Sequence, residues 1–285
     1  MSLGAQPSVD QSRVSGSVLP GGIIIDGSLR KDFCFKPVLG EMELVFSDAL
    51  VTSSSFPSMV TSVLQNSLES IAGESPTRHL VQQLSVGDRQ FLMRQLAAHV
   101  NDQETWVSAN CRACGETMDL SFRYSELPIK EASENYPGFT YECESGQYEI
   151  RVPIGEDQEV LASINGDGLE LLLNRVIAPV NGSKILALSN NDLEGIEAAI
   201  EDASPEVGNR LLAYCPHCEV ENTVEVDLYG FLSASNSQLL IDVHQIATHY
   251  HWSEDDILKL PTHRRKQYLA MIDRSRGMTG GENIQ

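Results

Sequence analysis

The sequence predicts an α+β protein made of two related strand–helix–helix–zinc-knuckle repeats, joined through a four-cysteine zinc ribbon and followed by a C-terminal helical hairpin. Three observations lead to this expectation. Two Cys-x-x-Cys pairs lie 104 positions apart, each between short strand-like segments. Helix-capping residues and apolar stripes precede both pairs at the same spacing. The residues after the second pair show helical periodicity.

The composition is typical of a soluble globular chain. The 285 residues are 41% hydrophobic, which suffices for a sizeable core, and the net charge of −20 would repel nucleic-acid phosphates. No stretch reaches the ~20 apolar residues that a membrane span needs. Residues 1–18 are rich in Ser, Gly and Gln, so we expect a disordered tail rather than a signal peptide, and a cytoplasmic protein.

The first repeat is expected over residues 19–128. Two short strands around a turn at Gly27 open it, and a capping-box spacing of Ser85 and Asp88 predicts the start of its second helix. The expected elements are strands at 21–26 and 32–37, helices at 57–71 and 87–100, and strands at 105–107 and 118–124.

The second repeat is expected over residues 129–232. A shift of 104 positions superposes the two capping boxes and the two cysteine pairs, and a shift of 115 superposes Gly40 on Gly155. The difference predicts about eleven extra residues in the first repeat, in a surface loop. The expected elements are strands at 148–153 and 223–228, a helix at 168–177, and a helix capped by Ser189 and Asp192.

The C-terminal hairpin is expected over residues 233–276. A helix over 233–250 carries apolar residues at helical spacing, Ser253 and Asp256 cap a short second helix, and Pro261 starts the last one. Residues 277–285 are expected to form a disordered tail.

The four cysteines of the two pairs, Cys111, Cys114, Cys215 and Cys218, predict one structural Zn²⁺ site. A two-residue spacer lets both sulfurs of a knuckle face one ion, and Gly115 suits the tight turn after the first pair. Four thiolates complete a tetrahedral shell. The separation of the pairs is long for a ribbon, and the repeat explains it, because each copy then supplies half of the site.

Three alternatives compete with structural zinc. A thioredoxin-like redox pair belongs at a helix N-terminus, where neither pair lies, and a catalytic zinc keeps an open position that four thiolates would fill. The cysteines can also be buried without metal. The two remaining cysteines, Cys34 and Cys143, lie on apolar strand-like segments, and we expect them to be buried packing residues.

The histidines His244, His249 and His251 offer a rival constellation, that of a zinc hydrolase. Positions 244 and 249 are five residues apart, which is poor for one helical face, and the chain contains no His-Glu-x-x-His pattern. Nucleotide-binding loops and nucleophile elbows are also missing from the sequence. We therefore expect no catalytic residues and a packing role for His249 and Trp252.

Several segments resemble one family. They are Leu19-Pro20-Gly21-Gly22 before the first strand pair, the YCPHC run at 214–218 followed by VEVDL and Phe231, and the HYHWSEDDILKLP run at 249–261 followed by RRKQYL. Together they resemble the hub assembly chaperones of contractile phage tails and phage-tail-like injection systems, of the T-even phage type. The resemblance extends over nearly the whole chain beyond residue 18.

The resemblance implies a non-enzymatic role in building a baseplate, with hub or spike proteins as partners. From the charge and the apolar pattern we expect neither a nucleic-acid nor a membrane target. The C-terminal hairpin then offers a docking patch, although its aromatics can equally fasten it to the body. The patch residues are Trp252, Ile257, Leu258, Arg264, Arg265 and Tyr268. The alternative function is a zinc-ribbon nucleic-acid-binding module, which the acids around the second knuckle disfavour.

Overall fold

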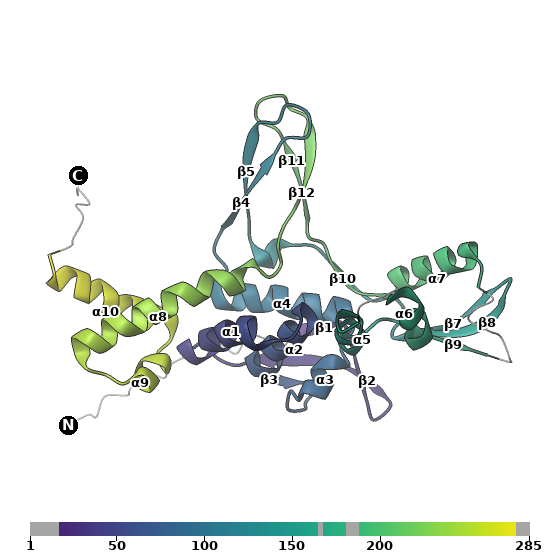
Figure 1. The fold of residues 1–285 in the computed structure, drawn as a ribbon, viewed down its shortest axis with the longest axis horizontal. Helices are drawn as coiled ribbons and strands as arrows, with labels where there is room; N and C mark the ends of the chain where they lie inside the picture. The colour runs from purple at the N-terminus through teal and green to yellow at the C-terminus, as the bar shows by residue number, and fades with distance from the viewer. Residues whose placement is uncertain (1–16, 165–167, 181–187, 278–285) are drawn as a thin grey trace, which may run out of the picture.

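The computed structural model describes residues 17–164, 168–180 and 188–277. The chain is a mixed α+β protein with four cysteines gathered in one place. A helical body lies at the centre, a small sheet with its helices at one end, and a helical hairpin at the other (Figure 1). The disorder expected for 1–18 and 277–285 falls outside the described ranges except at residues 17, 18 and 277. Ser17 and Val18 pair with β2 as the start of β1, so the expected end of the first tail is wrong by two residues.

The N-terminal part consists of a three-stranded antiparallel sheet, in the order β1-β2-β3, covered by helices. Strand β1 has a bulge between Val18 and Ile23, where Gly22 adopts a φ of 103°. The elements are β1 (Ser17–Ile25), β2 (Ser28–Phe35), α1 (Gly40–Thr52), α2 (Phe56–Ser67), β3 (Leu68–Ile71), α3 (Arg78–Gln82) and α4 (Val86–Asn101).

The helix expected over 57–71 is wrong in its last four residues. Helix α2 ends at Ser67, and 68–71 form β3, which pairs with β2 through Phe33 and Ile71. Apolar residues at Leu68 and Ile71 fit the helical stripe and the strand equally well, and the ladder with β2 decides between them. Helix α1 was not expected from the sequence.

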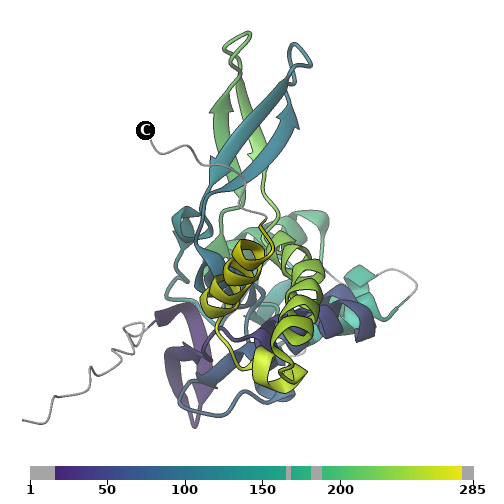
Figure 2. The same cartoon turned by 90° about the vertical axis from the view of Figure 1, so that its left-hand side faces the viewer.

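Two β-hairpins stand side by side and project from the body as an arm (Figures 1 and 2). We call residues 105–122 and 210–225 the arm. Its strands are β4 (Thr105–Asn110), β5 (Thr117–Phe122), β11 (Arg210–Tyr214) and β12 (Glu221–Glu225). Each hairpin is a two-stranded sheet of its own, β4 with β5 and β11 with β12.

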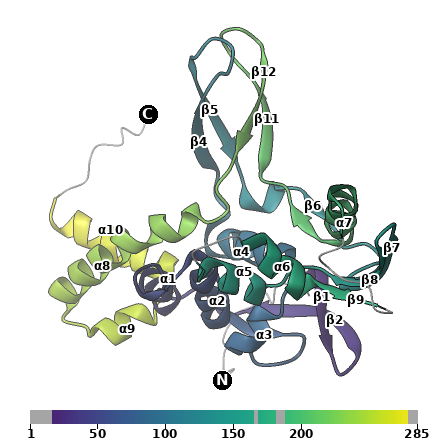
Figure 3. The same cartoon turned by 45° about the vertical axis from the view of Figure 1, so that its right-hand side comes forward.

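The second sheet lies beyond the body, with helices packed beside it (Figure 3). It has three antiparallel strands in the order β7-β8-β9. The elements between the two arm hairpins are η1 (Tyr124–Glu126), β6 (Ile129–Lys130), β7 (Gly138–Cys143), β8 (Gly146–Arg151), α5 (Gly155–Ala162), α6 (Gly168–Val176), β9 (Ile177–Pro179), α7 (Asn190–Ala203) and β10 (Glu206–Val207).

The C-terminal hairpin packs against the body through α1 (Figure 2). It comprises α8 (Gly230–Tyr250), α9 (Glu254–Leu258) and α10 (Thr262–Ser275). Helix α8 begins three residues before the expected boundary at 233 and continues without interruption to His251, whose φ of 58° ends it in the left-handed conformation.

Four apolar clusters hold the described residues together. The largest joins the first sheet, α1, α2 and α4 with the base of the arm, where Phe122, Val226 and Leu228 are buried. Smaller clusters lie in the second sheet, between the arm hairpins and within the C-terminal hairpin. Among the described helices, none combines the length and apolar character needed to cross a bilayer.

The Leu-Pro-Gly-Gly segment of β1 is fixed by a buried carboxylate. Gly21 and Gly22 donate their N–H groups to Asp88 at 2.8 and 3.0 Å, and Ser85 and Tyr136 donate hydroxyls to the same side chain. A Cβ on Gly21 would lie 2.5 Å from a carboxylate oxygen of Asp88. Burial raises the pKa of Asp88 despite these hydrogen bonds. The segment is therefore a packing requirement that links β1, α4 and the chain leading to β7.

Candidate metal centre

Each arm hairpin ends in a knuckle with the same backbone hydrogen bonds. In the first, Cys111 N–H donates to Glu116 O at 2.8 Å and Gly115 N–H to Cys111 O at 2.9 Å. In the second, Cys215 N–H donates to Val220 O at 3.0 Å, and the Glu219 N–H donates to Cys215 O at 2.9 Å. These bonds fold the four residues after each first cysteine into a tight turn.

The two knuckles bring all four sulfurs together. The Sγ atoms of Cys111 and Cys218 are 3.6 Å apart, those of Cys114 and Cys215 are 3.7 Å apart, and all four lie within 4.8 Å of one another. Tetrahedral Zn–S bonds of ~2.3 Å require sulfurs roughly 3.8 Å apart. Sulfur pairs that stand this close without disulfide bonds fit a tetrahedral ion, so the donor set and its spacing match structural zinc.

N–H groups of the turns point at the sulfurs. Ala113 N–H and His217 N–H lie 3.4 Å from the Sγ atoms of Cys111 and Cys215, at matching positions of the two knuckles. Cys111 and Cys215 are buried, whereas Cys114 and Cys218 are exposed. Donors of this kind stabilise negative charge on thiolates, which is the state that a metal requires.

A buried amide, Asn222, joins the hairpins. Its Oδ1 accepts from Arg112 N–H at 2.9 Å, and its Nδ2 donates to Val220 O at 2.7 Å and to Cys111 Sγ at 3.6 Å. Sequence reasoning missed this residue. The available signal was a polar side chain at an inward position of β12, two residues before the buried Val224.

The same turn conformation is carried by glycine in one knuckle and by glutamate in the other. Gly115 has a φ of 77°, which glycine adopts freely, and Glu219 has a φ of 59° at the corresponding place. The left-handed conformation is unfavourable for an L-residue with a side chain, so the second knuckle contains local backbone strain that the first does not.

The pKa values of the Cys111, Cys114 and Cys218 thiols are shifted by their neighbours in opposite directions. The backbone N–H groups of Cys114 and Ala113 lower the pKa of Cys111 to about 6. At Cys114 the Glu116 N–H lowers the pKa, but burial and the three neighbouring sulfurs outweigh it and raise the pKa to about 12. The pKa of Cys218 is also raised, since burial and the neighbouring sulfurs outweigh the Val220 N–H. A dication would remove this conflict, because thiolate charges that repel one another become ligands.

The remaining two cysteines lie outside the cluster. Cys34 is exposed on the outer face of β2, so the expectation that it is a buried packing residue is wrong. The alternation of β2 buries Phe33 and turns its neighbour outward. Cys143 is half-buried beside the second core, and burial raises its pKa.

The three histidines of the expected rival site do not form a metal site in the structure. His244, His249 and His251 are all exposed, and within the described ranges the four cysteines are the one group of three or more His, Cys, Asp or Glu side chains close enough to share an ion. His249 packs edge-on against Tyr250, and Trp252 packs on Tyr250 and Tyr268. Their geometry suits a packing role.

The patch expected on the C-terminal hairpin is wrong for three of its members. Ile257 and Leu258 are buried in the core of the hairpin itself, and Arg265 is fully buried in an ion pair with Glu43. Their helical spacing fits an inward face as well as an outward one. Trp252 and Tyr268 are half-buried in the same core, and Arg264 is exposed.

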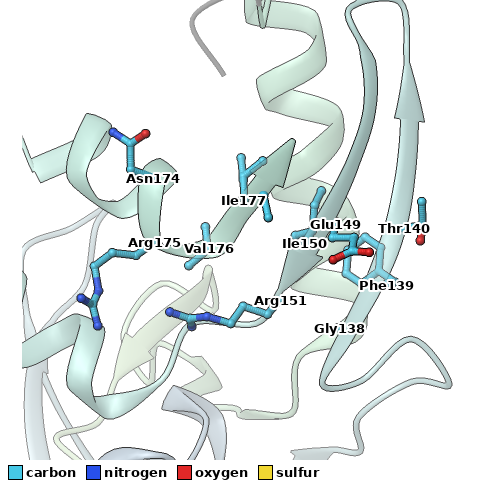
Figure 4. Close-up of a pocket in the computed structure, with 11 residues that line it drawn as sticks. Gly138, Phe139, Thr140, Glu149, Ile150, Arg151, Asn174, Arg175, Val176 and Ile177 are labelled. Atoms are coloured by element: carbon cyan, nitrogen blue, oxygen red, sulfur yellow. The ribbon is translucent and has the colours of Figure 1, made fainter. Parts of the chain in front are cut away.

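The second sheet contains a cavity of about 560 Å³, into which Arg151 and Arg175 extend (Figure 4). Both guanidinium groups bind the buried carboxylate of Asp157, at 2.6 to 2.8 Å, and Arg175 also reaches Glu156. Burial opposes ionisation of Asp157, but these arginines keep its pKa below the usual range. The charges therefore neutralise one another within the fold, and the network joins β8, α5 and α6 rather than offering a free anion site.

Comparison of the chain with protein-family models, with curated proteins and with solved structures found no match.

Proposed function

We propose that the chain is a non-enzymatic assembly factor or minor component of the baseplate hub in a contractile tail or a phage-tail-like injection system. Its arm is clamped by structural Zn²⁺ bound to Cys111, Cys114, Cys215 and Cys218. The observation that carries the structural half of the proposal is the approach of four sulfurs from two remote hairpins. The baseplate context comes from the sequence resemblance described above.

The closed donor set supports a structural role over a catalytic one. Four thiolates complete a tetrahedral shell and leave no position for a substrate or a water. The site lies at the tip of the projecting arm (Figure 3), where its effect is to hold two hairpins in a fixed relation. A rigid projection of this kind suits a protein that binds and orients partners.

We also infer that the two repeats arose by duplication. Helices α4 and α7 begin at positions 86 and 190, and the knuckles follow at the same shift of 104. Helices α1 and α5 begin at Gly40 and Gly155, at the shift of 115. Both three-stranded sheets share one strand order, with a hairpin followed by two helices and a third strand.

The charge of the arm disfavours the alternative nucleic-acid module. Its two hairpins contain five acidic side chains and two arginines, and a dication bound to four thiolates would add two further negative charges. DNA or RNA phosphates would be repelled by this surface. The same charge favours partner proteins with a basic surface.

The test is a deletion of the gene in a strain or phage that produces such particles, with electron microscopy of the tails. We expect assembly to stop before complete baseplates form, and the wild-type gene to restore it. A Cys111→Ser, Cys215→Ser double variant should fail to restore it, whereas Cys34→Ser, an exposed cysteine outside the cluster, should succeed. Normal tails in the deletion strain would disprove the baseplate role.

A binding measurement separates the two functions. The purified chain should co-sediment with the hub or spike protein of its own particle, and it should give no gel shift with DNA or RNA at modest salt. A shift that weakens steeply with salt, together with no binding to the hub, would favour the nucleic-acid module instead.

A further inference from the structure

The two hairpins of the arm can be compared position by position. Their cysteine pairs and their strand ladders are both related by the shift of 104, so that Ser108 of β4 corresponds to Leu212 of β11. In each strand, successive side chains point alternately toward the other hairpin and away from it. Each hairpin therefore has an inner face, which carries the buried contacts between the hairpins, and an outer face, whose side chains are exposed.

The inner faces differ at one polar position. Asn222 lies where the first hairpin has Met118, and both side chains are buried. Asn222 accepts a hydrogen bond from the N–H of Arg112, whose counterpart is Pro216, a residue without an N–H. An apolar Met118 in the first hairpin therefore leaves no donor of Pro216 unsatisfied, and the contact between the hairpins explains these differences.

The outer faces differ in a way that the fold does not explain. The two outward positions of β4 nearest the knuckle are polar, Ser108 and Asn110. Their counterparts in β11 are Leu212 and Tyr214, whose side chains are 69% and 70% exposed. Since the first knuckle hairpin forms with polar residues at these positions, the fold does not require the two large side chains. Trp106 is also exposed, but it lies on the outer face of the first hairpin.

The outer face of the second hairpin is built on the strands that hold two of the cysteines. We call it the outer patch, and its residues are Arg210, Leu212, Tyr214, Glu221, Thr223 and Glu225. Tyr214 directly precedes Cys215 and donates its hydroxyl to Glu221 at 3.1 Å. Arg210 pairs with Glu225 at 3.3 Å. The backbone of the outer patch is already ordered, which lowers the entropy that binding a partner would cost.

The charges around the outer patch define the chemistry of its partner. Glu221 and Glu225 lie on the patch and Glu219 lies in the adjoining turn, against a single arginine, Arg210. A dication bound to four thiolates would add two negative charges at the same end of the arm. Lysine and arginine side chains of a partner would complement these carboxylates, whereas anionic lipids and nucleic-acid phosphates would be repelled.

A second copy of this chain does not suit the outer patch. Each copy has a net charge of −20 and would bring the same carboxylates to the contact. The patch is also only two strands wide and five residues long, which is well short of the ~800 Å² per partner that a stable dimer buries. A larger basic protein can surround the patch and contact other parts of the arm as well.

We propose that the outer patch is a docking site for a basic surface of the hub or spike protein that the chain helps to assemble. Leu212 and Tyr214 fill an apolar recess of that protein, and its lysines or arginines face Glu221 and Glu225. The inference rests on the proposed function, and it assigns the contact with the partner to the second arm hairpin rather than to the C-terminal hairpin.

Binding of full-chain variants to the purified hub or spike protein, measured by surface plasmon resonance, tests the docking site. The Leu212→Ser, Tyr214→Asn variant gives the second hairpin the outward residues of the first. We expect it to bind at least tenfold more weakly than the wild type, because large side chains at the centre of an interface dominate its affinity. The matched control, Ser108→Ala with Asn110→Ala, should bind like the wild type. All four positions are exposed, so both variants should keep one metal ion per chain by elemental analysis.

Charge reversal gives a second measurement that leaves the apolar side chains in place. Glu221→Lys with Glu225→Lys should weaken binding at least tenfold at low salt, and added salt should weaken the wild-type complex. This variant decides the matter if the apolar variant loses its metal, and unchanged binding by it would then overturn the docking site.

The failure of the docking site is distinguishable from the failure of the proposed function. If the wild-type chain binds neither the hub nor the spike protein, the proposed function is wrong and the docking site with it. If the wild type binds and the metal-loaded apolar variant binds within twofold of it, the docking site alone is overturned. Self-association of the wild type in analytical ultracentrifugation, lost in the apolar variant, would assign the outer patch to a second copy and would also overturn the proposal.

Discussion

Removal of the metal should make the arm open far more often and leave the body folded. The bases of both hairpins are anchored in the main core by Phe122 and Val226, so chelation frees only the chain beyond these anchors. Between the hairpins, Met118 and Val224 are the buried apolar side chains besides the cysteines. The closed form without metal therefore depends on these two apolar side chains and on the hydrogen bond from Arg112 N–H to Asn222 Oδ1, against the entropy of holding the hairpins together.

The two opposing terms are close in size. Burying two such side chains stabilises the closed arm by about 3–6 kcal/mol. Fixing two hairpin tips relative to each other, equivalent to closing a loop of roughly 20 residues, costs about 3 kcal/mol. With about 1 kcal/mol from the hydrogen bond between Arg112 and Asn222, the closed arm without metal is favoured over the open arm by at most about 4 kcal/mol. Structural zinc contributes on the order of 10 kcal/mol in small peptides.

Hydrogen-exchange mass spectrometry measures this difference. In the metal-loaded chain, amides of β4, β5, β11 and β12 should be well protected. After chelation, with metal loss verified by elemental analysis, their protection factors should fall to on the order of 10³ or less, since ~1.4 kcal/mol corresponds to a factor of ten. The amides of α4 serve as the internal control and should change little. Unchanged protection in the metal-free arm would refute the clamp.

Other substitutions test individual features of the same fold. Glu219→Gly should stabilise the arm by about 0.5–1 kcal/mol, because glycine adopts the left-handed conformation at φ 59° without strain. Gly115→Ala should destabilise the arm by about 1 kcal/mol for the converse reason. The free energy of opening of the arm, measured by hydrogen exchange, reports both changes. Gly155→Val should lower the free energy of unfolding in urea by about 3 kcal/mol, since its side chain would displace the Arg89 guanidinium. As a control, Gly230→Ala should change it by less than about 0.5 kcal/mol, because a Cβ at Gly230 would lie 3.3 Å from its nearest atom. Hydrogen bonds from Ser145 and Ser189 lower the pKa of Asp192 to about 2, so its stabilisation of the α7 start is complete above its ordinary pKa and is lost as the pH falls toward 2. The Asp192→Asn variant should lack that acid-dependent loss when amide exchange in α7 is followed against pH.

Local patterns predicted the elements whose contacts are local. The cysteine spacing predicted the four sulfurs that the structure brings together, and the capping pairs at Ser85 and Ser189 predicted the starts of α4 and α7. A Cys-x-x-Cys turn and a helix cap are both completed within a few residues, so their physical cause is visible in a short segment.

Features that depend on distant partners were not visible in the sequence. Residues 68–71 became a strand because β2 offers a free edge, which the stripe of α2 does not encode. Arg265 looked like part of an exposed basic cluster, but a carboxylate 222 residues away holds it inside. The role of Asn222 was not visible for the same reason, because its side chain accepts a hydrogen bond from Arg112 N–H of the other hairpin.

The separation of the two knuckles has a consequence during synthesis. Cys114 and Cys215 are 101 residues apart, so a ribosome working at 5–20 residues per second needs roughly 5–20 s to deliver the second pair after the first. Throughout that interval the emerging polypeptide exposes only two thiols, too few to fill a four-sulfur shell. Tight capture of an ion by the four cysteines would then occur only once nearly all of the main body has left the exit tunnel, and metal uptake would be a late step in biogenesis.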